Sequence, residues 1–199
     1  MLIDHLSKFN IYLASQSPRR KELLQGMGIH FQVMPTHVPE IYPTHLQPHE
    51  VVEYLSQLKL STIDLQQFPD NSLFIACDTI VVLDQKIIEK PTDANDALRM
   101  LLQLSGREHT VMSGLTVISH NYKKTNHVKT KVKFRTFSEE ELQYYINKYK
   151  PFDKAGSYGV QEWIGYVGIE DIQGSFYNVM GLPTHLLWQM LDEAVQSNE

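Results

Sequence analysis

The segment from Leu73 to Leu83 constrains the fold most, because it is apolar nearly throughout and yet contains Asp78 and Thr79. Its length suits a buried strand and falls far short of the roughly 20 residues that a membrane-spanning helix needs. A carboxylate inside such a run is costly to bury unless it is paired or bound to a metal. Open α/β sheets build ligand sites at strand ends, so Asp78 is a candidate site residue. The alternative is a strand that stops at Cys77, although the apolar residues 80–82 argue against it.

Short apolar runs alternate with segments of helical periodicity along the rest of the chain. The expected strands cover residues 11–14, 31–34, 73–83, 110–119 and 127–134, with residues 87–88 pairing back onto 73–83. The expected helices cover residues 19–27 and 48–60, begin at Pro91-Thr92 and at Ser138, and close the chain around residues 186–191. This alternation predicts a mixed α/β protein whose sheet contains both parallel and antiparallel pairs.

Three local expectations follow from the same patterns. In the helix that opens at Pro91-Thr92, the leucines at 98, 101 and 102 are expected on one buried face. A polar turn over residues 121–126 is expected to join two β-rich segments as an antiparallel pair. The glycine-dense stretch after residue 156 predicts loops and short strands.

Composition narrows the classes of protein that fit this pattern. A chain of 199 residues suits one domain, or one domain with two lobes. The formal charge of -5 argues against a non-specific nucleic-acid binder, but a few converging cations suffice for a small anionic substrate. Cys77 is the only cysteine, which excludes an intramolecular disulfide and favours a reducing compartment. Residues 1–10 lack a signal peptide's apolar run, so we expect a cytoplasmic protein without a membrane partner.

The first candidate binding segment is Ser15-Gln16-Ser17-Pro18-Arg19-Arg20, where a strand leads into a helix. Ser17 is a plausible N-cap with Pro18 at the first helical position. Unpaired backbone N–H groups and the helix dipole favour an anion there, and the hydroxyls and guanidiniums add donors that a polyphosphate accepts. The alternative is a capped surface helix with two solvated arginines.

Other candidates are weaker when taken one at a time. Lys90 stands in a short Glu-Lys-Pro connection, where a lysine can reach a phosphate as a point charge. Gln161 ends a glycine-rich segment, and its amide can match the acceptor–donor–acceptor edge of uracil or thymine. Taken alone, Lys90 is better explained as an exposed loop residue, as are Lys59 and Glu40, and Gln161 as a surface glutamine in a turn. The spacing of two histidines and Glu53 does not support a zinc site, because Pro48 leaves His45 outside the helix.

Taken in order, six blocks cover nearly the whole chain after residue 10 and resemble one family. The blocks are LASQSPRRKELL (13–24), ACDTIV (76–81), EKP (89–91), SGREHTVMSG (105–114), KAGSYGVQ (154–161) and GSFYNVMGLP (174–183). The sequence is similar to the Maf proteins, nucleotide pyrophosphatases also described as septum-formation inhibitors. The resemblance implies an α/β, two-lobed mixed-sheet fold related to the inosine triphosphate pyrophosphatases, with the substrate in a cleft between the lobes. It also implies a single Maf-like domain over residues 1–199, of which residues 1–10 are a short extension.

The resemblance carries specific roles onto this chain. Asp78 is implied as the catalytic proton acceptor or metal ligand, Glu40 as the second acidic ligand and Lys90 as a further catalytic residue. The implied phosphate-binding set is Ser15, Arg19, Arg20, Lys59 and Lys90, and the implied specificity set is Arg19, Thr79 and Gln161. The implied cofactor is a divalent cation, Mg²⁺ or Mn²⁺, which favours carboxylate and phosphate oxygens. Water activated by the metal is expected to attack the α-phosphorus and release pyrophosphate.

The specificity positions imply hydrolysis of dTTP and UTP to the monophosphate, with a role in excluding modified nucleotides from nucleic acids and an influence on cell division. Two alternatives stay open. One is a nucleotide-binding regulator of division that does not depend on turnover, against which the retained Asp78, Glu40 and Lys90 argue. The other is a pyrophosphatase selective for purine nucleotides or 7-methyl-GTP. The sequence also leaves a homodimer open.

Overall fold

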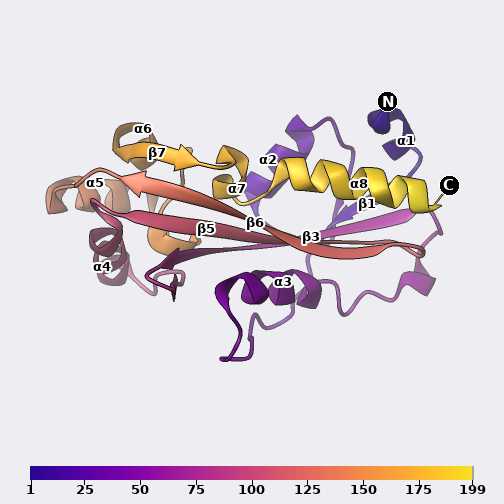
Figure 1. Ribbon diagram of the computed structural model, residues 1–199, viewed down its shortest axis with the longest axis horizontal. Helices are drawn as coiled ribbons and strands as arrows, with labels where there is room; N and C mark the ends of the chain where they lie inside the picture. The colour runs from indigo at the N-terminus through magenta and orange to yellow at the C-terminus, as the bar shows by residue number, and fades with distance from the viewer. Residues whose placement is uncertain (199) are drawn as a thin grey trace. The chain divides into compact units, whose positions relative to one another are not determined.

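The computed structural model describes residues 1–198, and within that range the chain is a mixed α/β protein (Figure 1). Across these residues, seven strands form one sheet in the order β2-β1-β3-β5-β6-β7, with β4 paired to β3. The strands are β1 (Asn10–Leu13), β2 (Gln32–Val33), β3 (Ser72–Leu83), β4 (Lys86–Ile88), β5 (Glu108–Ile118), β6 (Lys123–Phe134) and β7 (Ile169–Gln173). The α-helices are α1 (Leu2–Leu6), α2 (Pro18–Gly26), α3 (Pro48–Leu58), α4 (Ala94–Leu104), α5 (Glu139–Tyr149), α6 (Trp163–Gly168), α7 (Phe176–Met180) and α8 (Thr184–Asn198). Parallel pairing of β1 with β3 and antiparallel pairing of β3 with β4 confirm the mixed sheet.

The chain divides into two compact units. The first unit comprises residues 1–78, 113–128 and 181–198, and the second comprises residues 79–112 and 129–180. The divisions fall inside β3, β5 and β6, so each of these strands contributes residues to both units.

In the first unit, β1 lies between β2 and β3 in parallel register, with Leu13 opposite Val33 and Ile75. Helices α3 and α8 lie on opposite sides of these strands (Figure 1). Helix α3 packs directly on β5 at Gly114, because a Cβ atom there would lie 2.1 Å from the carbonyl oxygen of Val52. This close approach fixes the height of α3 above the sheet, and α3 carries Lys59 at its C-terminal end.

In the second unit, β3 turns back into β4 through Asp84 and Gln85, both of which have positive φ angles (49° and 65°). Two successive residues of this kind are typical of the tight hairpin turns that match the twist of a strand pair. Strand β7 pairs with β6 in antiparallel register, and Val132 lies opposite Ile172. The buried core of this unit includes the rings of Phe134 and Tyr145.

The structure corrects the expectation for the helix after Pro91. Helix α4 begins at Ala94, because the side chain of Asp93 accepts a hydrogen bond from the backbone N–H of Asp96 (2.8 Å) and caps it. Leu102 was expected on the buried face, and this is wrong, since its exposed fraction is 45%. The buried face is instead the one formed by the residues at 97, 100, 101 and 104, spaced by three or four.

Other local expectations also change. The stretch after residue 156 contains the expected short strand, β7, and also two short helices, α6 and α7, which were not expected. Strand β6 begins at Lys123, which shortens the expected polar turn. The first ten residues include α1, and Leu6 of that helix is buried. Within residues 1–198, no helix combines the length and the apolar character that crossing a bilayer requires.

Candidate functional site

The start of α2 gathers two hydroxyls and a guanidinium. Ser17 caps the helix, its Oγ accepting from the backbone N–H of Arg20 (3.5 Å), and Pro18 takes the first helical position as expected. The Oγ of Ser15 accepts from Nη1 of Arg20 (3.3 Å) and from the backbone N–H of Ser17 (3.2 Å). Nε of Arg20 donates to the carbonyl oxygen of Gly181 (2.9 Å). The arrangement holds donors at a helix N-terminus, which is where an anion is stabilised.

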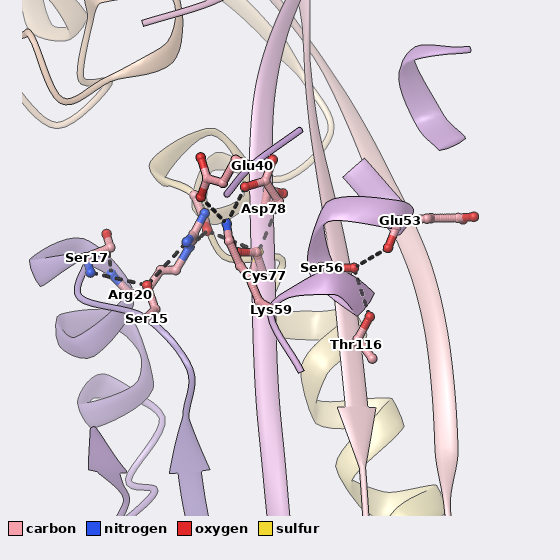
Figure 2. Close-up of polar contacts among 11 residues, drawn as sticks. Ser15, Ser17, Arg20, Glu40, Glu53, Ser56, Lys59, Cys77, Asp78 and Thr116 are labelled. Carbon is pink, nitrogen blue, oxygen red and sulfur yellow. Dashed lines mark hydrogen bonds and ion pairs between the residues drawn. The ribbon is translucent and has the colours of Figure 1, made fainter. Parts of the chain in front are cut away.

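An ion-pair cluster surrounds Lys59, the buried C-cap residue of α3. Its Nζ contacts Oδ1 of Asp78 and lies 2.9 Å from Oε1 of Glu40. It also donates to the carbonyl oxygen of Cys77 (3.4 Å). Figure 2 shows the ammonium group between the two carboxylates. Strand β3 continues through Asp78 to Leu83, so the alternative of a strand ending at Cys77 is wrong.

The carbonyl oxygen of Gly181 joins these two groups of side chains. It accepts from Nε of Arg20 (2.9 Å) and from Sγ of Cys77 (3.4 Å), the residue before Asp78. The helix start and the Lys59 cluster are therefore neighbours within the first unit, as Figure 2 also shows. Two cations and two carboxylates converge there around a position that is rich in hydrogen-bond donors.

In the second unit, the segment that ends at Gln161 is built tightly against its surroundings. The N–H of Gly156 donates to the carbonyl oxygen of Glu89 (3.1 Å), which ties this segment to the residue before Lys90. Gly156 has a φ angle of 69°, and a Cβ there would lie 2.9 Å from Cγ2 of Val81. Both observations explain why glycine stands at this position.

Two buried side chains, those of Tyr158 and His109, hold the same segment in place. The hydroxyl of Tyr158 and Nε2 of His109 share a hydrogen bond of 2.7 Å, and both residues are buried. Burial lowers the pKa of His109 to about 4, and burial raises the pKa of Tyr158 well above its ordinary value of 10.0. Both groups are therefore neutral near pH 7. Among residues 1–198, Oε1 of Gln161 is buried and meets no hydrogen-bond partner.

The sequence-predicted site residues divide between the units. The first unit holds Ser15, Arg19, Arg20, Glu40, Lys59 and Asp78, and the second holds Thr79, Lys90 and Gln161. Direct contacts join Ser15 with Arg20, and Lys59 with both Glu40 and Asp78. The predicted cleft between lobes stays a prediction.

Two participants escaped sequence reasoning. The carbonyl oxygen of Gly181 links Arg20 to Cys77, and only the position of this glycine in the Gly-Leu-Pro segment before the last helix signalled a role. The side chain of Cys77 is fully buried. Its backbone carbonyl accepts from Lys59, a contact that no side-chain pattern can reveal.

The donor set at Lys59 can be tested against the implied divalent metal. Within residues 1–198, no group of three or more histidine, cysteine, aspartate or glutamate side chains could hold a metal ion. The carboxylates of Asp78 and Glu40 do approach a common cation, the ammonium of Lys59. Mg²⁺ is commonly held by one or two carboxylates, with waters and substrate phosphates completing its shell. The residues therefore fit a metal that shares its coordination with a phosphate.

A family model described as "Maf-like protein" matches residues 10–194. Curated proteins are similar over nearly the full chain. A protein of Porphyromonas gingivalis is 46% identical over 201 residues, covering 99% of this chain and 100% of its own length. One of Cytophaga hutchinsonii is 47% identical over 193 residues (97% and 88%), and one of Christiangramia forsetii is 41% identical over 197 residues (99% and 100%). Each of the three is named dTTP/UTP pyrophosphatase.

Proposed function

The chain belongs to the Maf-like protein family, and from this premise we propose that it hydrolyses dTTP and UTP to the nucleoside monophosphate and pyrophosphate. Its relatives' name supports the reaction and the substrates. The observation that carries the proposal is the buried pair of Lys59 and Asp78, joined by the more exposed Glu40, beside a helix N-terminus. Burying a carboxylate and an ammonium group together is costly, and a packed apolar core would not need it. The proposal includes a single domain over residues 1–199, with residues 1–10 as an extension.

The first unit's residues divide the work on the triphosphate. Ser15, Arg20 and the N-terminal N–H groups of α2 bind phosphate oxygens, and Arg19 adds a further cation on the first turn. Asp78 accepts the proton of the water that attacks the α-phosphorus. Lys59 holds the Asp78 carboxylate in place through their ion pair before the substrate arrives, and then neutralises charge on the pyrophosphate leaving group. Lys90 belongs to the same phosphate-binding set.

Asp78 and Glu40 would hold a divalent cation, Mg²⁺ or Mn²⁺. When bound, this cation neutralises triphosphate charge and lowers the pKa of a bound water. Asp78 and Glu40 already share the ammonium group of Lys59, so they would hold the cation only once Lys59 has another partner. The phosphate oxygens of a bound triphosphate would give Lys59 that partner. We therefore expect metal and nucleotide to bind together.

Recognition of the base belongs to Gln161, Thr79 and Arg19. The buried Oε1 of Gln161 lacks a partner among residues 1–198, and leaving a buried acceptor unpaired costs free energy. The N3–H donor of uracil or thymine can supply that partner, whereas cytosine has an acceptor at the same ring position. Hydrolysis of modified pyrimidine triphosphates at this site would keep them out of nucleic acids.

Product analysis tests the proposal directly. Purified protein with Mg²⁺ or Mn²⁺ is given dTTP, UTP, CTP, GTP or 7-methyl-GTP, and monophosphate and pyrophosphate are measured. We expect turnover of dTTP and UTP, and loss of at least about 1,000-fold in Asp78→Asn, because the proton acceptor is removed. Asp84→Asn is the matched control, since Asp84 lies on the hairpin turn after the same strand and pairs with Arg107; it should keep wild-type rates.

Each other outcome has a definite meaning. Turnover of the purine nucleotides alone would retain the chemistry and overturn the base assignment. No turnover of any nucleotide would favour a binding regulator of division. Near-normal rates in Asp78→Asn would remove Asp78 from the mechanism.

A further inference from the structure

A second buried lysine–carboxylate network lies in the second unit, away from the residues assigned to the phosphates. Nζ of Lys154 lies 3.1 Å from Oε1 of Glu162 and 2.8 Å from Oδ1 of Asp153. The other oxygen of Glu162, Oε2, accepts a hydrogen bond from the hydroxyl of Tyr145. That hydroxyl in turn accepts from the backbone N–H of Gly159 (3.0 Å). The network therefore runs from a cation through a carboxylate and a phenol to the main chain.

The protonation state of Tyr145 determines which groups donate and which accept hydrogen bonds in this network. Burial, and then the hydrogen bond to Glu162, raise the pKa of Tyr145 well above its ordinary value of 10.0. The phenol therefore keeps its proton, so it donates to Glu162 and uses its oxygen for the N–H of Gly159. The single hydroxyl thus links the carboxylate of Glu162 to the main chain at Gly159.

The network closes around a four-residue turn that has Gln161 inside it. The N–H of Glu162 donates to the carbonyl oxygen of Gly159 (3.0 Å), which defines the turn. A Cβ at Gly159 would lie 2.8 Å from Cδ of Glu162, so the carboxyl group packs against the bare α-carbon. The first and last residues of the turn are thus held by the same carboxylate and phenol. Gln161, between them, has little freedom in its backbone.

We propose that Tyr145, Glu162 and Lys154 are positioning residues for base recognition, which hold Gln161 in the orientation that selects uracil and thymine over cytosine. The inference rests on the proposed function, in which Gln161 reads the base. An amide selects between bases only if it is presented to them at a fixed place, so its selectivity depends in part on the rigidity of the turn that carries it. The same side chains thereby give a reason for burying two charges where no phosphate group is assigned.

The ratio of kcat/KM for UTP to kcat/KM for CTP distinguishes a positioning role of these residues from a purely structural one. Loss of general stability lowers kcat/KM for UTP and CTP by the same factor, because both use the same phosphate site. Loosening the turn lowers kcat/KM for UTP, which pairs with Gln161, and leaves the slower CTP reaction nearly unchanged. The UTP:CTP ratio therefore reports the position of Gln161 and is insensitive to a uniform loss of active protein.

Tyr145→Phe is the informative variant, because it removes one hydroxyl and keeps the ring in the core. Tyr149→Phe is the matched control, since its ring stacks on that of Tyr145 with centroids 5.2 Å apart. We expect Tyr145→Phe to reduce the UTP:CTP ratio of kcat/KM by about tenfold, and Tyr149→Phe to leave it within about twofold. Lys154→Arg keeps the charge and should retain most of the selectivity, whereas Lys154→Met should lose it; this pair serves if Tyr145→Phe does not fold.

Two results would overturn the inference. One is a UTP:CTP ratio unchanged in both Tyr145→Phe and Lys154→Met while their melting temperatures fall, which would make the network a stabiliser of the fold only. The other is a wild-type protein that turns over UTP and CTP equally. Failure of the proposed function looks different, because the wild-type protein would then release no pyrophosphate from either nucleotide.

Discussion

Two buried lysines have the same kind of partners and different surroundings. Lys59 in the first unit and Lys154 in the second have exposed fractions of 9% and 8%, and each contacts carboxylates from two positions. Around Lys154, the carboxylate of Glu162 also accepts a hydrogen bond from the phenol of Tyr145, which itself accepts from a backbone N–H. Around Lys59, the ammonium itself is what Asp78 and Glu40 share.

The difference shows what a buried ion pair can be used for. Neither cluster is strong evidence of stabilisation, because desolvating the charges offsets most of their attraction. The cluster at Lys154 ends on a backbone N–H, so it fixes the course of a turn. The cluster at Lys59 places one ammonium group between two carboxylates, beside a helix N-terminus that favours anions. The first arrangement positions a loop, and the second is suited to exchange its cation for another and to receive phosphates.

Replacing one carboxylate in each cluster should give the largest contrast. Glu40→Gln is expected to lower kcat on the order of a thousandfold, about 4 kcal/mol in barrier height, because a charged ligand at the reaction centre is lost. Its melting temperature should change little, because the Glu40 side chain is 44% exposed. Glu162→Gln should instead lower the melting temperature and the UTP:CTP ratio and leave kcat for CTP near wild type. Steady-state kinetics and thermal unfolding of both variants decide the matter, and similar losses of kcat in the two would erase the distinction.

Removing each lysine tests whether the cation is exchangeable. Lys59→Met and Lys154→Met should each cost about 3 kcal/mol of stability, because each leaves a buried carboxylate without its cation. Mn²⁺ without nucleotide should restore much of the melting temperature of Lys59→Met, since Asp78 and Glu40 can then take the metal directly. It should not restore Lys154→Met. Thermal unfolding with a series of Mn²⁺ concentrations, with EDTA as the metal-free reference, measures both. Equal changes in the melting temperatures of the two variants on adding Mn²⁺ would show that Asp78 and Glu40 do not bind the metal.

Sequence reasoning succeeded where local chemistry decides the structure. The cap at Ser17, the proline at the first position of α2 and the continuous strand through Asp78 all depend on nearest neighbours along the chain. The face of α4 was mistaken at Leu102, because periodicity gives the spacing of a buried stripe and only tertiary packing selects which stripe is buried. The two short helices after residue 156 were missed, since glycine there reflects close packing as well as turns: a Cβ at Gly168 would lie 1.9 Å from Cζ of Phe137.

The candidate site shows the same limit. Residue types and family resemblance identified Lys59, Asp78 and Glu40, but no spacing in the sequence brings residues 40, 59 and 78 onto one ammonium group. The network at Tyr145 was even less accessible. No local pattern marks Tyr145, because its role depends on a hydroxyl that meets a carboxylate and a backbone N–H from a distant turn.

Acid should distinguish the two regions through His109, which supports the segment of the second unit that contains Gln161. Burial lowers the pKa of His109 in the folded protein to about 4, from an ordinary value of 6.5. Below pH 6.5 the unfolded chain therefore binds a proton that the folded chain does not, and stability falls as the pH drops from 6.5 towards 4. Between pH 7.5 and 5.5 the free energy of unfolding should decrease by about 1 kcal/mol from this group. Urea unfolding of the wild-type protein and of His109→Gln at both pH values measures the difference, and the variant should show a smaller decrease. Glu141, whose pKa the neighbouring Arg135 lowers to about 2, contributes only below pH 4.5 and so does not obscure this window. An equal decrease of the free energy of unfolding in both proteins would mean that protonation of His109 does not cause the acid sensitivity. The acid sensitivity would then arise from other groups in the protein.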